Sequence, residues 1–263
     1  MSVARLGVVA YLNARPLVHG LERRTDRFVL RFDPPSVCAT ALCDGAIDLG
    51  TIPSIEYLRG SDYRLVPGVA IASHGPVASV ALYSRKPIAA IRSIAADTNS
   101  RTSVALLRVL CARAFGIDPA LEPMAPDAEA MLARCDAALI IGDAALFLDH
   151  EAAGLHKTDL GEVWTALTGR PFVWAVWAGR AGALAPDGIE ALQAARNSGV
   201  RDRDAIATAY AGGDARRAEI GRRYLRTNMR YDLDEDATAG LAAFFRLAAG
   251  MGLAPKAGPL RFY

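Results

Sequence analysis

The sequence predicts an α/β fold of two lobes, each a mostly parallel sheet flanked by helices, with a ligand cleft between the lobes. Short apolar runs alternate with helix-forming segments through the first two-thirds of the chain, and the last third has the pattern of helices. The 263 residues suffice for one large domain or two modest ones. Buried strands that alternate with helices are typical of parallel sheets covered on both faces.

The opening of the chain predicts a strand followed by a helix three times. Val3–Tyr11 is apolar and predicts a buried strand, after which Pro16 can begin a helix because the first helical turn needs no N–H group there. Ser36 is expected to cap a helix that continues through Asp44 and ends at Gly45. The other predicted elements of this part are strands at 28–32 and 47–52 and a helical turn at 53–58.

A second series of strands and helices follows. Val77–Tyr83 predicts a strand, and Val104–Phe115 predicts a helix because its apolar residues recur at helical spacing. Gly116 is expected to end that helix. The remaining predicted elements are strands at 137–141 and 172–178 and helices at 144–148, 189–196, 201–211, 215–225 and 235–249.

The chain is expected to cross between the lobes twice, through residues 78–85 and 173–180. Lobe 1 then comprises residues 1–80 and 178–263, with a helical C-terminal part, and lobe 2 comprises residues 81–177. This arrangement is that of a type II periplasmic-binding-protein-like fold. Ligands of such sheets lie at the carboxyl ends of the strands, so turns from both lobes are expected to face one cleft.

Composition argues against several classes of protein. Thirty basic and 28 acidic residues leave a net charge of +2, which is too balanced to hold a nucleic-acid backbone. No apolar run approaches the roughly 20 residues of a membrane helix, and the N-terminus has no signal-peptide pattern, so a cytoplasmic protein is expected. The four cysteines form no C-x-x-C pair and the four histidines have no ligand spacing, so no metal or disulfide is expected.

Six segments spread along the chain match one known family. They are residues 11–17 (YLNARPL), 45–50 (GAIDLG), 53–57 (PSIEY), 75–80 (GPVASV), 97–103 (DTNSRTS) and 140–144 (IIGDA). On these segments the chain resembles the chorismate dehydratases, the first enzymes of the futalosine route to menaquinone. A sister family of the same route, the 1,4-dihydroxy-6-naphthoate synthases, shares the fold and is the nearest alternative.

The resemblance implies a reaction and a substrate. Chorismate, a small dicarboxylate, would lose its ring hydroxyl and a neighbouring ring proton as water, which leaves the aromatic 3-[(1-carboxyvinyl)oxy]benzoate. The resemblance implies no cofactor, and the chain has no phosphate-binding glycine loop, H-E-x-x-H or G-x-S-x-G motif. Because this fold is best known among binding proteins, a non-catalytic small-anion binding protein is the alternative from another class.

Asn13 and Ser79 are the two residues expected to touch the reacting part of the substrate. Asn13 follows the first strand, and an amide there would make a turn, hydrogen-bond the leaving hydroxyl or hold a carboxylate. Ser79 lies in the GPVASV segment on a predicted crossing strand, where it would be a buried hydroxyl or a cleft residue. Arg15 could pair with a carboxylate in a bidentate fork, or be solvated at the surface.

A substrate with two carboxylates needs donors, and helix N-termini supply free N–H groups with partial positive charge. The turn before the predicted helix 104–115 is therefore expected to bind a carboxylate, although ordinary capping is the alternative for its hydroxyls. Asp143 is expected to cap a helix in a turn that lines the cleft. The substrate-binding residues predicted on these grounds are Ser54, Ser100, Arg101, Thr102, Ser103, Gly142 and Asp143.

Nothing near these motifs is an obvious general base. Asn13 and Ser79 do not titrate near neutral pH, and His74 is the only histidine in a suitable loop. We therefore hypothesise that the enolpyruvyl carboxylate of the substrate removes the ring proton, because it is tethered to the carbon that loses that proton.

Overall fold

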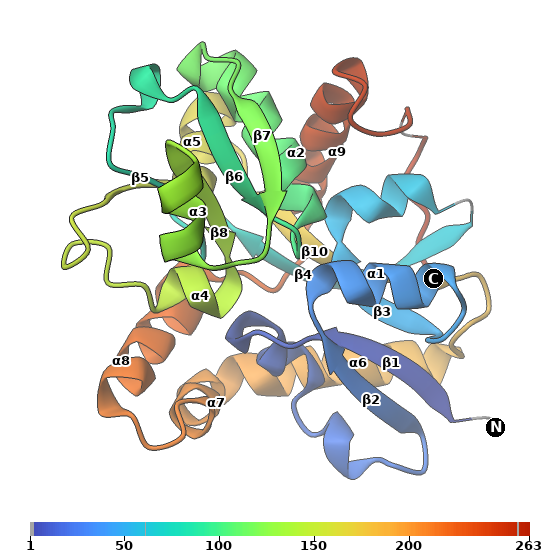
Figure 1. The fold of residues 1–263 in the computed structure, drawn as a ribbon. Coiled ribbons are helices and arrows are strands. Elements are labelled where there is room, and N and C mark those ends of the chain that lie inside the picture. Colours follow the sequence, from blue (N-terminus) through green and yellow to red (C-terminus); the bar gives the residue numbers. More distant parts are fainter. Residues whose placement is uncertain (1–2, 61, 257) are drawn as a thin grey trace.

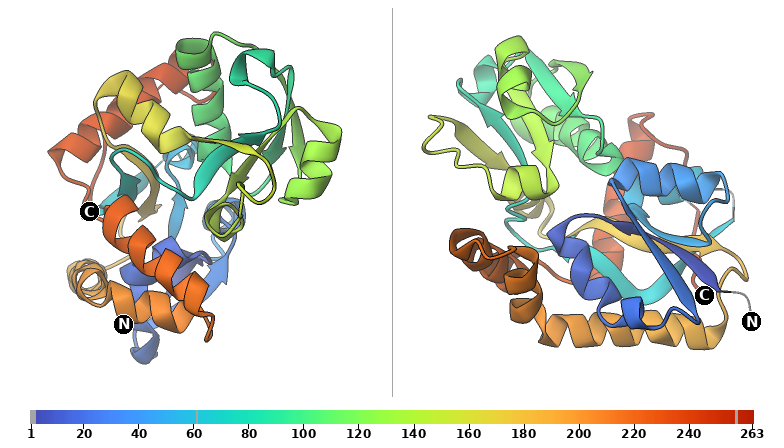
Figure 2. Two further views of the ribbon diagram at one scale, coloured as in Figure 1. Left: turned by 90° about the vertical axis from the view of Figure 1, so that its left-hand side faces the viewer. Right: turned by 60° about the horizontal axis from the view of Figure 1, so that its bottom comes forward.

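Two five-stranded sheets, each flanked by helices, form the protein in the computed structural model, which describes residues 3–60, 62–256 and 258–263 (Figure 1). We call the part around the first sheet lobe 1 and the part around the second sheet lobe 2. The two sheets lie side by side, and the C-terminal helices pass beneath and behind them (Figure 2). This architecture confirms the predicted fold class.

The sheet of lobe 1 has the strand order β2-β1-β3-β10-β4. β1 pairs in parallel with β2 and β3, whereas β10 pairs antiparallel with β3 and β4. Its strands are β1 (Ala4–Val9), β2 (Phe28–Asp33), β3 (Leu49–Pro53), β4 (Tyr63–Ser73) and β10 (Phe172–Arg180).

The sheet of lobe 2 repeats this pattern in the order β7-β6-β8-β5-β9. β6 pairs in parallel with β7 and β8, and β5 pairs antiparallel with β8 and β9. Its strands are β5 (Val80–Ser84), β6 (Ser93–Asp97), β7 (Ala120–Met124), β8 (Ala137–Ile141) and β9 (His156–Asp159).

Each sheet is mixed, with two parallel and two antiparallel pairings, rather than mostly parallel. The reason is the same in both lobes. β5 enters lobe 2 directly from lobe 1, β10 enters lobe 1 from lobe 2, and each of these strands runs against its neighbours in the sheet that it joins.

The predicted crossing segments are placed too late in the chain. β5 and β10 each belong to a single sheet, and the chain passes between the sheets in the connections before them, residues 74–79 and 169–171. Residue 177, the predicted end of lobe 2, lies within β10. The predicted domain limits themselves remain a prediction.

The helices cover the outer faces of the sheets. After β10, the named elements of the chain are all helices. α6 packs on β4 and on the short helix after β1, while α9 packs on α2 and β10. The α-helices are α1 (Pro35–Cys43), α2 (Arg101–Leu110), α3 (Ala128–Arg134), α4 (Gly142–Leu146), α5 (Leu160–Thr168), α6 (Pro186–Arg201), α7 (Arg203–Tyr210), α8 (Ala215–Arg223) and α9 (Glu235–Gly250). Short 3₁₀ helices span Leu12–Val18, Leu21–Arg23, Ser54–Arg59 and Ile88–Ala90, and π-helices span Cys111–Phe115 and Tyr224–Asn228.

Several predicted helix starts are wrong, among them those at Pro16 and Ser36. Pro16 lies inside the 3₁₀ helix Leu12–Val18 and does not begin it, because the chain already turns directly after β1. Ser36 does not cap α1, which begins one residue earlier at Pro35, where the fixed φ of proline suits the first helical position. Gly116 ends the π-helix Cys111–Phe115, which continues α2, with φ +63°, so the predicted end of this helical segment is confirmed.

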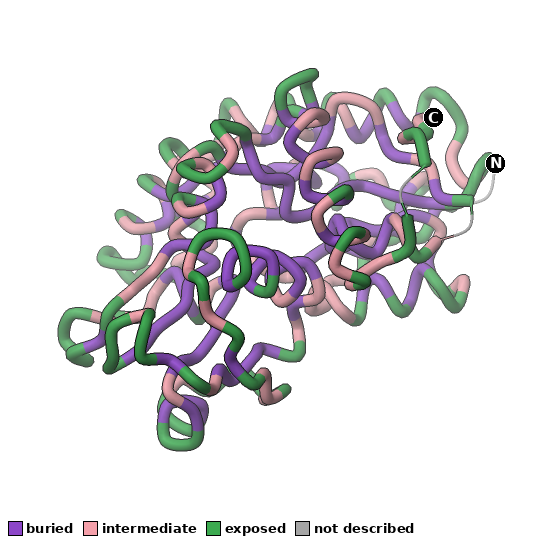
Figure 3. The backbone as a smooth tube through the Cα atoms, turned by 90° about the horizontal axis from the view of Figure 1, so that it is seen from above, coloured by how far each residue is buried: buried purple, intermediate pink, exposed green. Residues whose placement is uncertain are grey.

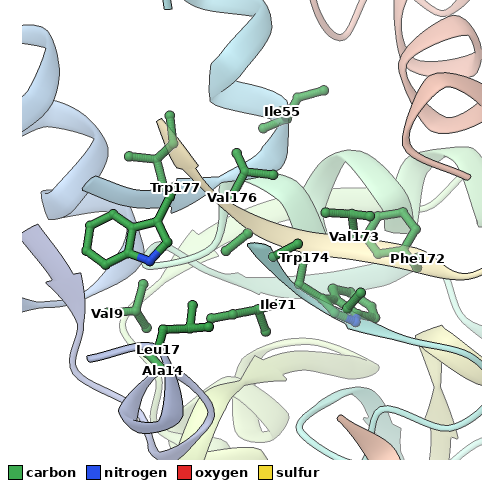
Figure 4. Packing of buried hydrophobic residues seen from close by; sticks show 14 of the residues in the cluster. Val9, Ala14, Leu17, Ile55, Ile71, Phe172, Val173, Trp174, Val176 and Trp177 are labelled. Carbon is green, nitrogen blue, oxygen red and sulfur yellow. The ribbon is translucent and has the colours of Figure 1, made fainter. Parts of the chain in front are cut away.

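One large apolar core runs through both lobes, and exposed residues lie mainly at the outside of the molecule (Figure 3). Trp177 on β10 packs near Val9, Ala14 and Leu17 of lobe 1 (Figure 4). Trp164 is fully buried, and its ring meets that of Phe172 edge to face. In the described part of the chain, no helix is long and apolar enough to cross a membrane.

Candidate active site

A small pocket lies where the carboxyl ends of strands from both sheets meet. It measures about 50 Å³. β1, β3 and β10 contribute to it from lobe 1, and the end of β8 and the start of α2 contribute from lobe 2. The residues that line it are Val9, Tyr11, Asn13, Pro35, Pro53, Ile71, Val77, Ser79, Val80, Ser100, Thr102, Ser103, Ile141, Gly142, Trp174 and Ala175.

Asn13 and Ser79 meet at this pocket through a third residue, Tyr224. Asn13 Nδ2 donates to the Tyr224 hydroxyl over 3.1 Å, and that hydroxyl lies 2.7 Å from Ser79 Oγ. Asn13 comes from the 3₁₀ helix after β1, Ser79 from the connection between the lobes, and Tyr224 from the π-helix after α8. The two residues predicted to act on the substrate are thus brought together, although 66 positions separate them in the chain.

Ser79 is held in place by an unusual backbone turn. Ala78 has φ +63°, the only positive value of a non-glycine residue in the described part of the chain. The carboxylate of Asp159 accepts hydrogen bonds from the N–H groups of Val77 and Ala78, at 3.0 and 2.6 Å, and Lys157 Nζ donates to the Ala78 carbonyl at 3.0 Å. Strained residues that the surroundings hold in place are common at functional sites, and this one directs Ser79 to the pocket.

Gly142 lines the pocket and packs directly against the Tyr11 ring. It has φ +64°, and a Cβ at this position would lie 2.5 Å from the Tyr11 ring. Its N–H group donates to the Ser79 carbonyl at 2.8 Å, which ties α4 to the connection between the lobes. Only glycine suits both the backbone conformation and the close approach of the ring.

The hydroxyl-rich start of α2 lies at the pocket. Ser100 caps α2 and accepts from the Ser103 N–H group at 3.2 Å, so its hydroxyl performs the ordinary capping role. Thr102 reaches across to lobe 1, where its Oγ1 accepts from the Ile55 N–H group at 3.2 Å and lies 3.5 Å from Ser54 Oγ. Ser54 and Thr102 therefore hold the two lobes together in this structure, next to the pocket.

Arg101 lies outside the pocket lining. Its guanidinium pairs with Glu56 at 2.8 Å and with Thr40 Oγ1 at 3.0 Å, both in lobe 1. Glu56 also pairs with Arg59 and is almost fully buried. In this structure Arg101 joins the lobes and does not face the ligand space.

Arg15 also lies outside the pocket lining. Its guanidinium stacks on the rings of Phe32 and Tyr210, 4.1 and 5.3 Å from their centres, and it faces Glu22 across 4.0 Å. These contacts hold its planar group against the two rings, and it does not line this pocket.

Asp143 joins the lobes rather than capping a helix, since α4 begins after Ile141 without a side-chain cap. One carboxylate oxygen accepts from the Leu12 N–H group at 3.2 Å, and the other accepts from the Tyr210 hydroxyl at 2.5 Å. Burial raises the pKa of this carboxyl above its ordinary value, and the bond from Tyr210 opposes that shift. The side chain is not part of the pocket lining.

Tyr11 is the one side chain among the described lining residues that titrates. Burial raises its pKa above the ordinary value, with further contributions from Asp97 and Asp143, so the phenol keeps its proton at neutral pH. Asp97 is buried behind the lining, and burial raises its pKa as well. His74 is exposed and does not line the pocket. The lining that the structure describes therefore presents hydroxyls and an amide, and no carboxylate or imidazole.

Sequence reasoning missed three residues of the site. Tyr224 falls within the predicted helix 215–225, Tyr11 at the end of the predicted strand 3–11, and Trp174 within the predicted strand 172–178, so the sequence pattern singles out none of them. Trp174 lines the pocket and donates to Ser73 Oγ at 3.0 Å, whereas the other two tryptophans are core residues. Tyr11 could have been suspected, because it opens the YLNARPL segment next to Asn13.

Comparisons with known proteins find similar sequences and similar folds. A family model described as menaquinone biosynthesis matches residues 4–250. A curated chorismate dehydratase from Thermus thermophilus is 32% identical over 95% of this chain and 96% of its own length. Among solved structures, a protein of Archaeoglobus fulgidus has a TM-score of 0.77 at 18% identity, covering 95% of this chain and 98% of the other.

The alkanesulfonate-binding protein of Xanthomonas axonopodis pv. citri, solved with bound MOPS, is similar in fold. It has a TM-score of 0.69 at 22% identity, covering 97% of this chain and 95% of its own. At such identities these structures show the fold, which is the periplasmic-binding-protein fold.

Proposed function

The chain belongs to the menaquinone-biosynthesis family, and from this premise we propose that it is a chorismate dehydratase, a lyase that converts chorismate into 3-[(1-carboxyvinyl)oxy]benzoate and water. The proposal places the reaction in the futalosine route and the protein in the cytoplasm, with neither nucleic acid nor membrane as a partner. The curated dehydratase, which matches along nearly the whole chain, supports the activity.

The chemistry of the pocket lining is the observation that carries this proposal. Asn13, Ser79, Thr102 and Ser103 offer neutral hydrogen-bonding groups, and the lining that the structure describes has no carboxylate to repel a dianion. The start of α2 adds free N–H groups and a partial positive charge for one carboxylate. Trp174 offers an apolar face for a ring of the size of chorismate.

We propose that the substrate supplies the base. A carboxylate oxygen of the enolpyruvyl group takes the proton from the ring carbon that bears the ether. The C–H electron pair becomes a ring double bond, the neighbouring C–O bond breaks, and the departing hydroxide takes up that proton and leaves as water. The only titrating residue in the described lining is Tyr11. Its raised pKa keeps the phenol protonated at neutral pH, so it is not available as a base, which supports this assignment.

Two alternatives have particular support. A small-anion binding protein is favoured by the likeness to the sulfonate-binding protein, and a dihydroxynaphthoate-forming enzyme would share the family and the fold. One experiment separates all three. Purified protein is mixed with chorismate and no additive, and the absorption spectrum and mass of the product are followed.

The proposal expects a new aromatic spectrum and a product lighter than chorismate by one water. Chorismate that binds but survives unchanged would establish the binding protein instead. Protein that neither binds nor converts chorismate would favour the sister enzyme, which acts on a later compound of the route.

Ligand binding is expected to require movement of the lobes. The pocket of about 50 Å³ is far smaller than the roughly 300–1,000 Å³ of ordinary small-molecule sites. The contacts of Thr102, Asp143 and Arg101 between the lobes must therefore open to admit a ligand. The free protein in solution is therefore expected to populate an opened state, from which ligand binding closes the lobes. Small-angle scattering is then expected to show compaction when the product is added. No compaction, together with a crystal structure that places the product outside the pocket, would contradict this expectation.

Replacing Thr102 by valine is expected to raise KM about 5- to 150-fold, because one hydrogen bond to a charged group is worth roughly 1–3 kcal/mol. The change keeps the shape of the side chain and removes only the hydroxyl. Thr208→Val is the control, since the exposed Thr208 hydroxyl donates to the Asp204 carbonyl, accepts from Arg222 and does not line the pocket. An unchanged KM with a lowered Tm would show that Thr102 serves only the contact with Ile55.

A further inference from the structure

Tyr224 is buried behind the pocket and joins the two residues proposed to act on the substrate. Its side chain is 2% exposed, and its hydroxyl contacts Asn13 Nδ2 at 3.1 Å and Ser79 Oγ at 2.7 Å. It does not line the pocket itself. It begins the π-helix Tyr224–Asn228, and such helices, which are rare, occur frequently at functional sites.

The hydrogen-bonding capacity of the three groups fixes the direction of each bond. Asn13 Nδ2 can only donate, so the Tyr224 oxygen accepts from it. Burial raises the pKa of Tyr224, so the phenol keeps its single proton. The acceptor within reach of that proton is Ser79 Oγ. Tyr224 therefore donates to Ser79, which leaves the proton of the Ser79 hydroxyl free for another partner.

Asn13, at the other end of this row of hydrogen bonds, also has a free group. Asn13 Oδ1 is buried and has no hydrogen-bond partner among the described residues. Since Asn13 and Ser79 both line the pocket, the acceptor Oδ1 and the Ser79 O–H donor are the groups left to serve a ligand there. Leaving a buried acceptor without a partner is unfavourable, so Asn13 Oδ1 marks a place where a ligand donor belongs.

We propose that Tyr224 is a positioning residue that sets the polarity of this site, so that Asn13 presents an acceptor and Ser79 a donor to one ligand hydroxyl. The inference rests on the proposed function and assigns an orientation to the substrate. A hydroxyl both donates and accepts, whereas a carboxylate only accepts and would be repelled by Asn13 Oδ1. The leaving hydroxyl of chorismate therefore lies at Asn13 and Ser79, and the ring carboxylate lies at the start of α2.

The main test is Tyr224→Phe, which removes one oxygen and keeps the buried ring. Without the hydroxyl, the Asn13 amide loses its partner and is free to turn its donor into the pocket. We expect kcat to fall about 10- to 100-fold, with KM changed less than about threefold. Tyr231→Phe is the matched control. Tyr231 is equally buried, and its hydroxyl has no hydrogen-bond partner in the described part of the chain, so kcat should be unchanged.

Combining variants separates positioning from packing. If Tyr224 acts through Asn13, then Tyr224→Phe should lower kcat much less in an Asn13→Ala background than in the wild type. If the double variant instead loses kcat by the product of the two single-variant factors, the proposal is overturned. A fall in kcat for Tyr231→Phe as large as for Tyr224→Phe would also overturn it.

A measurement without substrate keeps the inference separate from the proposed function. In ¹⁵N-labelled protein, the side-chain NH₂ signal of Asn13, assigned by its loss in Asn13→Ala, should exchange slowly with water. It should exchange fast in Tyr224→Phe and remain slow in Tyr231→Phe. Equal exchange in the wild type and Tyr224→Phe would overturn the inference even if chorismate is converted. Failure to convert chorismate would reject the proposed function and leave the exchange result to decide the role of Tyr224.

Discussion

A chorismate analogue with a carboxamide in place of the enolpyruvyl carboxylate is expected to bind and to aromatise at least 1,000-fold more slowly than chorismate. The reason is that the tethered carboxylate is the base in this account. A base held next to its proton acts with an effective concentration of about 10⁵–10⁸ M, which no group in bulk solvent can match. Binding is measured by calorimetry and turnover by the aromatic absorption.

The analogue experiment needs two protein controls. Asp143→Asn and His74→Gln remove the nearest alternative bases that the sequence suggests, and neither should abolish turnover of chorismate. Asp143 already accepts two hydrogen bonds and His74 is exposed, so neither is placed to reach the ring. An analogue that aromatises at the normal rate, together with an inactive Asp143→Asn variant, would assign the base to the protein.

Loss of the Asn13 amide is expected to lower kcat several-fold to a few hundredfold. One hydrogen bond formed in the transition state is worth up to roughly 3–4 kcal/mol, and Asn13 is expected to hold the departing hydroxyl. Asn13→Ala tests this with initial rates and Tm. Asn13→Gln should recover little, because its longer side chain moves the amide away from Tyr224 and the pocket. Asn197→Ala, on the exposed face of α6, is the control.

An Asn13→Ala variant with wild-type kcat would remove this residue from the mechanism. A variant with normal kcat and a lowered Tm would assign it to the turn after β1, which was the structural alternative. Full recovery by glutamine would show that the position of the amide is not important.

The strands that follow a simple apolar pattern could be predicted from the sequence, and those interrupted by other signals could not. β8 was predicted with its observed limits, because five buried apolar residues follow one another. β4 was missed because Pro67 and Gly68 stand in its middle and look like a turn. In the structure they form a bulge, with Gly68 at φ +72° and a shift in register against β10.

The strands at the edges of the second sheet escaped prediction for another reason. β7 contains Pro123 and β9 has the sequence His-Lys-Thr-Asp, and both lie at the ends of the strand order. An edge strand pairs on one side only, so it tolerates proline and polar residues that would argue against a central strand.

In the candidate site, too, some residues could be predicted from the sequence and others could not. Asn13 and Ser79 lie in segments that carry the resemblance, and the strand ends bring them to the pocket. The roles of Arg101 and Asp143 could not be seen, because each is decided by a partner of the other lobe, Glu56 or Tyr210, that is distant in the chain. The contact of Tyr224 with Ser79 could not be predicted for the same reason, since 145 residues separate the two in the chain.

A crystal structure of the Asn13→Ala variant with bound chorismate would test the central claim most directly. The account predicts that the ligand lies in the pocket between the two sheets, with its ring carboxylate at the start of α2. A carboxylate oxygen of the enolpyruvyl group should lie about 3–3.5 Å from the ring carbon that loses its proton. A ligand outside the pocket, or a carboxylate of Asp97 or Asp143 closer to that carbon than the substrate's own, would contradict it.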